Sequence, residues 1–158
     1  MDIQDLGAIG ELIGSIAVVV TLIYLAQQIR QNTRQLHVSN SESFVDRHYN
    51  LVTPLAMDKE FLKKWKRAGS QFEELDEDEQ DQFIMYEWRA ITSWNHYHHL
   101  RQNGLVADSQ WHELTWIIEN VGQRESMRAA WKMYRESYSQ EFRDFMDSYM
   151  LSKSAIGT

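Results

Sequence analysis

The stretch LGAIGELIGSIAVVVTLIYLAQQIRQNTRQ, residues 6–35, decides the expected fold. The one charged side chain between residues 6 and 26 is Glu11, and residues 12–26 carry no charge. At about 1.5 Å per residue, a helix over residues 6–26 is roughly 32 Å long, which matches the roughly 30 Å hydrocarbon core of a bilayer. The pattern therefore predicts a transmembrane helix.

Two other kinds of segment produce an apolar run near an N-terminus. A cleaved signal peptide starts with basic residues and has a shorter apolar core, whereas Asp2 and Asp5 precede this run and Gln27 follows it. The core helix of a soluble bundle can also be apolar on all sides, so it stays an alternative. We favour the membrane span because the uncharged run is long enough to cross a bilayer.

The basic residues near the run predict its orientation. No Lys or Arg precedes it, whereas Arg30 and Arg34 follow within two turns. Because basic residues mark the cytoplasmic side of a span, we expect the N-terminus outside and the rest of the chain in the cytoplasm.

Small residues recur within the run at steps of three and four, so they share one helix face. The stripe consists of Gly7, Gly10, Gly14, Ala17 and Thr21. Small residues let two helix backbones approach closely in lipid, which predicts self-association through this face. The alternative is that glycine and alanine are simply common in membrane helices.

Glu11 is an ionisable residue inside the expected span, and such residues are usually functional. It lies close to the helix start, where a carboxylate can reach the headgroups and is favoured by the helix dipole. We therefore expect an interfacial role. The alternative is an oligomeric conduit for ions or solutes, with Glu11 and Ser15 as the intramembrane polar residues.

The composition of the 158-residue chain indicates an all-α protein, with one proline and many strong helix formers. Its net charge of −7 argues against nucleic acid as a partner. The absence of cysteine excludes disulfides and thiolate zinc sites.

Helix start and stop signals divide the remainder of the chain. We expect the anchor (residues 1–28) to continue as a helical stalk (29–53), bent near residues 39–41 and ended by Pro54. A compact antiparallel bundle (54–152) follows, and then a frayed tail (153–158). Within the bundle the expected helix starts are Asp58, Asp76, Asp108 and either Ser137 or Ser139, and the expected stops are Gly69, Gly104 and Gly122. The aromatic residues recur at helical spacing, which favours core packing over a cofactor site.

The candidates for chemistry are few. His96 and His99 share a helix face, and His112 on the next helix can approach them, which makes these three weak candidates for a metal site. No G-x-S-x-G elbow and no phosphate-binding glycine loop occurs. Glu87 and Arg89 flank the inner face of their helix and are expected to pair with other helices. We therefore expect no cofactor and no enzymatic activity, and the alternative is a metal-dependent enzyme that uses His96, His99 and His112.

Two stretches carry a family resemblance. The first is GAIGELIGSIAVVVTLIYLAQQIRQNTRQL, a glycine-spaced span with a Leu-Ala-x-Gln-Ile-Arg-Gln-Asn-Thr exit. The second is the Tyr- and Trp-rich C-terminal half, with HYHHLRQNGLVADSQW and GQRESMRAAWKMYRESYSQEFRDFMDSYM. Both resemble a group of small bacterial single-pass membrane-anchored helical proteins of unknown function. His98 and His99 stand where that group would have other polar or aromatic residues, which argues against a shared metal site.

The resemblance implies an anchor in the bacterial inner membrane and a helical domain, and it implies no activity. Together with the glycine stripe, it predicts a non-enzymatic interaction protein, scaffold or accessory subunit. Its expected partners are the lipid bilayer and either further copies of the chain or a larger membrane complex.

Overall fold

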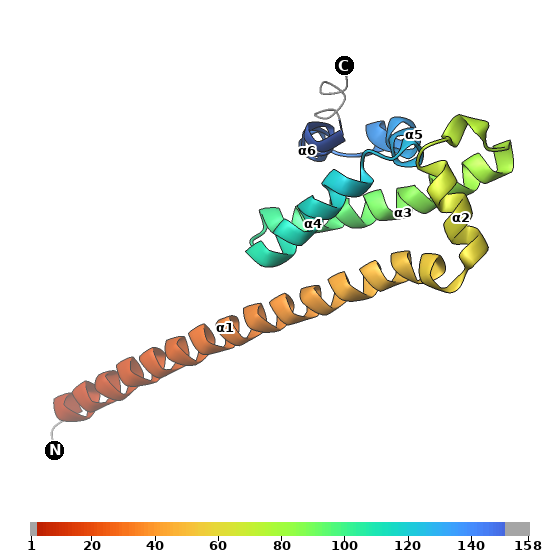
Figure 1. Ribbon diagram of the computed structural model, residues 1–158. Coiled ribbons are helices and arrows are strands. Elements are labelled where there is room, and N and C mark those ends of the chain that lie inside the picture. Colours follow the sequence, from red (N-terminus) through yellow and green to blue (C-terminus); the bar gives the residue numbers. More distant parts are fainter. Residues whose placement is uncertain (1–2, 151–158) are drawn as a thin grey trace. The chain divides into compact units, whose positions relative to one another are not determined.

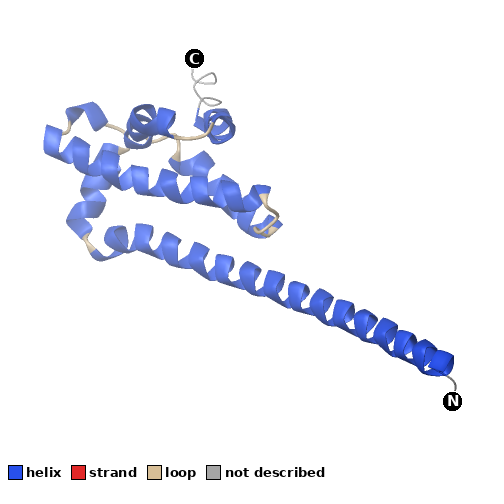
Figure 2. Cartoon of the chain, turned by 180° about the vertical axis from the view of Figure 1, so that it is seen from behind, coloured by secondary structure: helices blue, strands red, loops and turns tan. Residues whose placement is uncertain are grey.

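The computed structural model describes residues 3–150. These residues form six α-helices and the short 3₁₀ helices η1 (Phe72–Glu74) and η2 (Arg135–Ser137), without any strand. Short loops join the helices (Figure 1 and Figure 2). The all-α prediction, a long N-terminal helix followed by a helical bundle, is confirmed. The expected frayed tail, residues 153–158, lies outside the described residues.

The first helix, α1 (Ile3–Met57), is 55 residues long and stays helical through residues 39–41. It also continues through Pro54, so the prediction that this proline ends the helix is wrong. A proline removes its own N–H, which would otherwise pair with the carbonyl four residues earlier. In the last turn this leaves one carbonyl, that of Asn50, without its helical donor, and the helix ends only at Met57.

The chain divides into two compact units, Met1–Ser39 and Asn40–Thr158. The second unit begins inside the range 29–53 that the sequence pattern assigns to a stalk. Residues 40–57 of α1 therefore belong with the bundle. Phe44 illustrates this, because its side chain is 7% exposed and its ring meets the edge of Tyr97 with centroids 4.9 Å apart.

The second helix, α2 (Lys59–Ala68), starts where its capping residue predicts. The Asp58 carboxylate accepts hydrogen bonds from the N–H groups of Glu60 and Phe61 at 2.9 and 3.0 Å. These bonds satisfy backbone donors that the first turn leaves open. Gly69 caps the C-terminal end, as expected.

The longest helix of the bundle outside α1 is α3 (Glu77–Gln102). The Asp76 carboxylate caps its start by accepting from the Glu79 N–H at 2.8 Å. The chain turns at Gly104, just after the C-terminal end of α3. The φ of Gly104 is 69°, a left-handed conformation that glycine adopts easily because it has no Cβ atom. Both boundaries were predicted.

The next helix, α4 (Asp108–Val121), shows that the prediction of Asp108 as its cap is wrong. Ala107 occupies the cap position, and Asp108 is the first helical residue. The Asp108 carboxylate instead pairs with the Arg101 guanidinium at 2.7 Å. As the first helical residue, Asp108 lies one position beyond the cap, and its exposed carboxylate forms this ion pair with the end of α3.

The C-terminal part consists of α5 (Glu125–Tyr134) and α6 (Gln140–Met150), with η2 after α5. The Ser139 hydroxyl oxygen accepts from the Phe142 N–H at 3.4 Å. Of the two expected restart signals, Ser139 is therefore the one that the helix uses.

A single apolar core lies between the helices of the bundle, and α3 and α5 form its most extensive contact. Most of the aromatic residues expected to pack inward contribute to it, whereas Trp88, which was also expected to do so, lies outside it. Its fully covered side chains include Phe83, Ile91, Ile118, Met127, Phe142 and Met146. Burial of each such side chain stabilises the fold by about 1.5–3 kcal/mol before entropy is counted.

Candidate functional site

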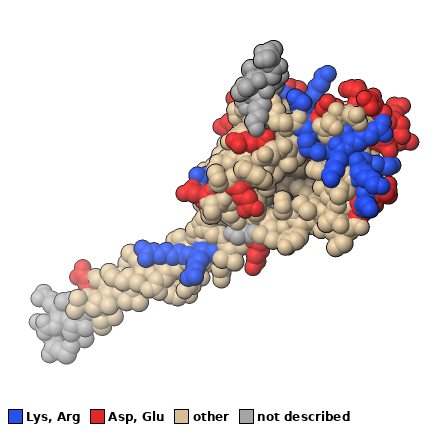
Figure 3. Space-filling view, viewed as in Figure 1, with Lys and Arg blue, Asp and Glu red and all other residues tan. Residues whose placement is uncertain are grey.

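The N-terminal half of α1 carries a continuous apolar surface. Its large side chains between residues 12 and 25 are each 45–62% exposed. In Figure 3 this part of the helix is almost free of charged side chains, whereas charges gather over the bundle. Among the described helices, α1 is the one that is long and apolar enough to cross a membrane.

The glycine stripe lies open on this surface. A Cβ atom built on Gly7, Gly10 or Gly14 would meet no atom within 4 Å. Ala17 and Thr21 continue the stripe, and the Thr21 hydroxyl donates to the Ala17 carbonyl at 2.8 Å. The side chains on this face are therefore small, and the Thr21 hydroxyl already has a hydrogen-bond partner. Small side chains leave room for the backbone of another helix to approach.

Glu11 and Ser15 lie one turn apart in the same segment. The Ser15 hydroxyl donates to the Glu11 backbone carbonyl at 2.8 Å, so the helix itself satisfies this hydroxyl. The Glu11 side chain is exposed and has no ion-pair partner among the described residues. Glu11 thus stands alone as the charged group of the apolar surface.

The three candidate metal ligands, His96, His99 and His112, are all exposed. Within the described part of the chain, no group of three His, Cys, Asp or Glu side chains is arranged to hold a metal. His98, by contrast, is buried, with its ring 4.9 Å from that of Phe145. Burial, followed by the charge of His99, lowers the pKa of His98. This histidine is part of the aromatic core.

Glu87 makes the buried polar contact that ties three helices together. Its carboxylate is 2% exposed and accepts a bond from the Ser126 hydroxyl at 2.9 Å. The Arg124 guanidinium approaches the same carboxylate oxygen at 3.4 Å and also donates to the Trp65 carbonyl. The centre of this guanidinium lies 3.5 Å from the centroid of the Trp65 ring. Glu87 on α3, Arg124 before α5 and Trp65 on α2 therefore form one cluster, which we call the buried ion-pair cluster.

Gly69 completes the surroundings of this cluster. A Cβ atom at Gly69 would lie 2.6 Å from a terminal nitrogen of Arg124, so a side chain there would displace the guanidinium. The Gly69 carbonyl also accepts from the Glu125 N–H at 3.1 Å. The glycine that ends α2 is thus also the residue that makes room for the arginine.

Burial and charge oppose each other in the cluster. Burial raises the pKa of Glu87. The charge of Arg124 and the hydrogen bond from the Ser126 hydroxyl lower it, but the effect of burial is larger and the pKa stays above its ordinary value. Burial likewise lowers the pKa of Arg124, against the attraction of Glu87. A buried charge without its partner is costly, so each residue depends on the other.

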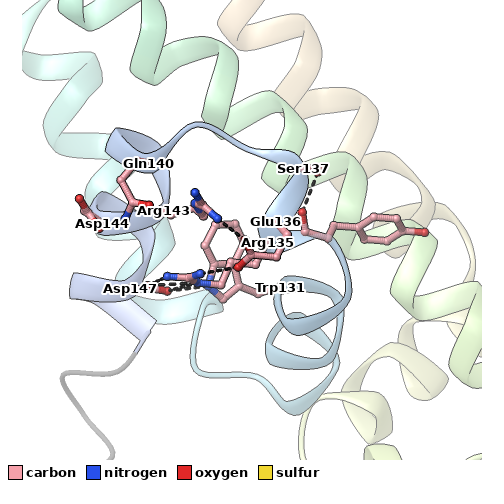
Figure 4. A network of polar contacts seen from close by, with 9 residues as sticks. Trp131, Arg135, Glu136, Ser137, Gln140, Arg143, Asp144 and Asp147 are labelled. Carbon is pink, nitrogen blue, oxygen red and sulfur yellow. Dashed lines mark hydrogen bonds and ion pairs between the residues drawn. The ribbon is translucent and has the colours of Figure 1, made fainter.

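A second polar network lies at the surface between α5, η2 and α6 (Figure 4). The Arg135 guanidinium donates to the Asp147 carboxylate at 2.6 Å, and the Trp131 indole N–H donates to the same carboxylate at 2.8 Å. Arg135 also pairs with Glu136 at 2.7 Å. Hydrogen bonding to Arg135 lowers the pKa of Asp147, against a smaller opposing effect of burial.

The sequence pattern led us to expect Glu87 at the border of the inner face of α3 and paired with another helix, but the structure buries it on that face, and the pattern did not identify its partner. Glu87 lies between Ile84 and Ile91 on the inner face of α3, and a charged residue there implies a cation from another helix. That cation is Arg124, and helical periodicity could not reveal it because it lies in a turn. Arg89, which was also expected to pair, forms no ion pair within the described residues.

No family model, curated protein or solved structure matches the chain at a significant level. The function is therefore inferred from the chain's own residues and contacts.

Replacing Arg124 by Ala should lower the free energy of unfolding by about 3 kcal/mol, because Glu87 then remains buried without its cation. The measurement is denaturant unfolding of the full chain. Glu87→Gln in the same background should recover part of the loss, since it removes the unpaired charge. Arg128→Ala, an exposed arginine on the same helix, is the control and should change stability by less than about 0.5 kcal/mol.

The loss in Arg124→Ala should also depend on pH. Without Arg124 the pKa of Glu87 rises further above its ordinary value of 4.5. A carboxyl group whose pKa is higher in the folded state favours folding when protonated, and this contribution is lost as the pH rises through the folded-state pKa. The difference from the native chain should therefore shrink as the pH falls toward 4.5. A difference that is independent of pH would contradict the assigned role of Glu87.

Asp147→Asn should lower stability by about 1 kcal/mol, because the network is partly exposed to solvent. A carboxylate with a lowered pKa stabilises the fold above its unfolded-state pKa and loses this effect as the pH falls through the folded-state value. The native chain should thus lose its advantage over Asp147→Asn below the ordinary pKa of 3.8. Thermal unfolding of both proteins between neutral and acidic pH measures this, and an unchanged difference would refute it.

Proposed function

We propose that the protein is a non-enzymatic, membrane-anchored interaction protein. Residues 6–26 of α1 cross the inner membrane of a bacterium, the N-terminus lies outside, and the helical bundle lies in the cytoplasm. The chain self-associates through the glycine stripe or docks on a larger membrane complex, as a scaffold or accessory subunit.

One observation carries this proposal: the continuous exposed apolar surface of α1. Soluble monomers rarely expose contiguous apolar patches of more than a few hundred Å². Here every large side chain from residue 12 to residue 25 is about half exposed or more. Lipid is the environment that covers such a surface on all sides of a single helix.

The orientation is supported by the basic residues. Arg30 and Arg34 follow the apolar segment within two turns, and the described helix before it carries no basic residue. Basic residues are retained on the cytoplasmic side during insertion. The bundle follows these residues in the chain, which favours a cytoplasmic location for it.

The role as an interaction protein is supported by the contacts of the buried carboxylate in the bundle and by the open glycine stripe on α1. The buried carboxylate of Glu87 is taken up by Arg124 and Ser126, so it serves packing. His96, His99 and His112 are exposed. The glycine stripe offers a face for another helix, and contacts of this kind hold subunits together within lipid.

The membrane assignment predicts that the full chain sediments with membranes after cell lysis and resists extraction at alkaline pH. The physical reason is the large apolar area that would otherwise face water. A matched variant with Val18→Lys and Ile23→Lys should move to the soluble fraction or be degraded, because two charges in the span make insertion unfavourable. Native protein that remains in the supernatant without detergent would disprove the membrane anchor.

The stripe predicts that Gly14→Leu reduces the size of the oligomer in mild detergent. A leucine side chain at this position keeps the backbone of a second helix away. Val19→Phe adds bulk to another face of the same helix and should leave the oligomer unchanged. Light scattering of the detergent-solubilised chain measures the mass. Equal masses for the native protein and Gly14→Leu would show that the stripe is not the contact.

A further inference from the structure

A groove of about 300 Å³ lies within the bundle unit between α1 and α3. This volume is at the lower end of the range for small-molecule sites. Its walls combine basic, polar and apolar side chains from the two helices. The lining residues are Arg47, Asn50 and Leu51 on α1 and Trp88, Arg89, Thr92 and Ser93 on α3.

The charges of the groove are all positive. Arg47 and Arg89 line it, and no Asp or Glu does. Neither arginine forms an ion pair within residues 3–150, whereas Arg101, Arg124 and Arg135 each pair with a carboxylate. In a chain with a net charge of −7, two arginines facing one groove without an acid are a local exception.

The neighbouring histidine reports the same uncompensated charge. Burial lowers the pKa of His96, and the charge of Arg47 lowers it further, ahead of a contribution from His99. Arg47 itself forms no ion pair among the described residues. Such a cation is available to a ligand without first breaking an ion pair.

Contacts on either side of the groove hold its two helices in place. The Tyr86 hydroxyl donates to the Leu51 carbonyl, and the Phe44 ring packs edge-on against Tyr97. Both contacts connect α1 to α3. The groove is thus formed by the folded bundle and does not require a ligand to create it.

The residues of α3 that line the groove also contact the C-terminal part of the chain. The Trp88 ring packs against the Tyr134 ring with centroids 5.1 Å apart. The Thr92 hydroxyl lies 3.1 Å from the Tyr138 hydroxyl, within hydrogen-bonding distance. These contacts restrict the aromatic side chain that a ligand would meet.

We propose that this groove binds a small organic oxyanion, a carboxylate or a phosphate ester that carries a planar apolar group. Arginine guanidinium groups match carboxylate and phosphate in geometry and donate two parallel hydrogen bonds. Arg47 and Arg89 bind the oxyanion from opposite helices. Trp88 and Leu51 supply apolar surface for the remainder of the ligand.

The apolar wall distinguishes this ligand class from a simple inorganic ion. Inorganic phosphate would satisfy the two arginines but leave the Trp88 and Leu51 surface in contact with water. An aromatic ring on the anion covers that surface and adds hydrophobic free energy. We therefore expect phenyl phosphate and benzoate to bind more tightly than inorganic phosphate and acetate.

The experiment is calorimetric titration of the full detergent-solubilised chain with these four anions. One aromatic anion should bind with a stoichiometry of one per chain, and the comparison of phenyl phosphate with benzoate identifies the oxyanion. Arg47→Gln and Arg89→Gln should each weaken binding about tenfold, the loss of one charge-assisted hydrogen-bonded contact. Arg128→Gln, an exposed arginine outside the groove, should bind as the native chain does.

The indole N–H resonance of Trp88 gives a second measurement. It is identified by its loss in Trp88→Phe, and it should shift on addition of the aromatic anion to the native chain. The absence of binding by all four anions at millimolar concentration would overturn the proposal. Binding that survives both Arg47→Gln and Arg89→Gln would also overturn it, because the anion would then occupy another basic surface, such as that of α2. Because both arginines are exposed, the two variants should retain the melting temperature of the native chain.

Discussion

Arg124 is the residue on which the arrangement of the bundle depends. Its guanidinium contacts the Glu87 carboxylate on α3, the carbonyl and ring of Trp65 on α2, and the space left by Gly69. Its own position, in the turn before α5, adds a third helix to the contact. Apolar packing alone is tolerant of small shifts between helices, whereas a buried charge requires its partner at a particular place. The cluster therefore selects one relative placement of these three helices, and the apolar core supplies the free energy that stabilises it.

The two units of the chain differ in whether their large apolar side chains are buried or exposed. In the bundle, large side chains of α3 and α5 such as Phe83, Ile91 and Met127 are covered, and the buried carboxylate of Glu87 has a cation. In residues 12–25 of α1, the large side chains are exposed and no residue is charged. A helix that is apolar on all sides is stable in an apolar surrounding and unfavourable in water. The same chain thus contains a segment suited to lipid and a domain suited to water, which is the physical basis for the proposed anchor.

Local signals predicted most helix boundaries, and contacts between distant residues account for the errors. Asp58, Asp76 and Gly104 act within a few residues of their own position, so the sequence alone locates them. Asp108 looks like the same kind of cap, but it is the first helical residue, and its carboxylate pairs with Arg101 at the end of the preceding helix. The partner of Glu87 could not be predicted for a similar reason, because helical periodicity does not show that residue 124 lies next to α3 in the folded chain. The candidate groove shows the limit most clearly, because Arg47 and Arg89 share it only once α1 and α3 are packed together.

The origin of that groove lies in how α1 and α3 meet. Two tyrosines of α3 donate to backbone carbonyls of α1: Tyr86 to Leu51, and Tyr97 to Asn40 at 3.5 Å. These two hydrogen bonds join α3 to the backbone of α1 at separate points, and the Phe44 ring of α1 packs against Tyr97 between them. The space between the contacts is lined by exposed Arg47 and Arg89 and by no acid. Neither arginine forms an ion pair among the described residues, so neither contributes one to the contact between α1 and α3. Two exposed arginines add little to the stability of the bundle, which agrees with the proposal that they serve to bind a ligand.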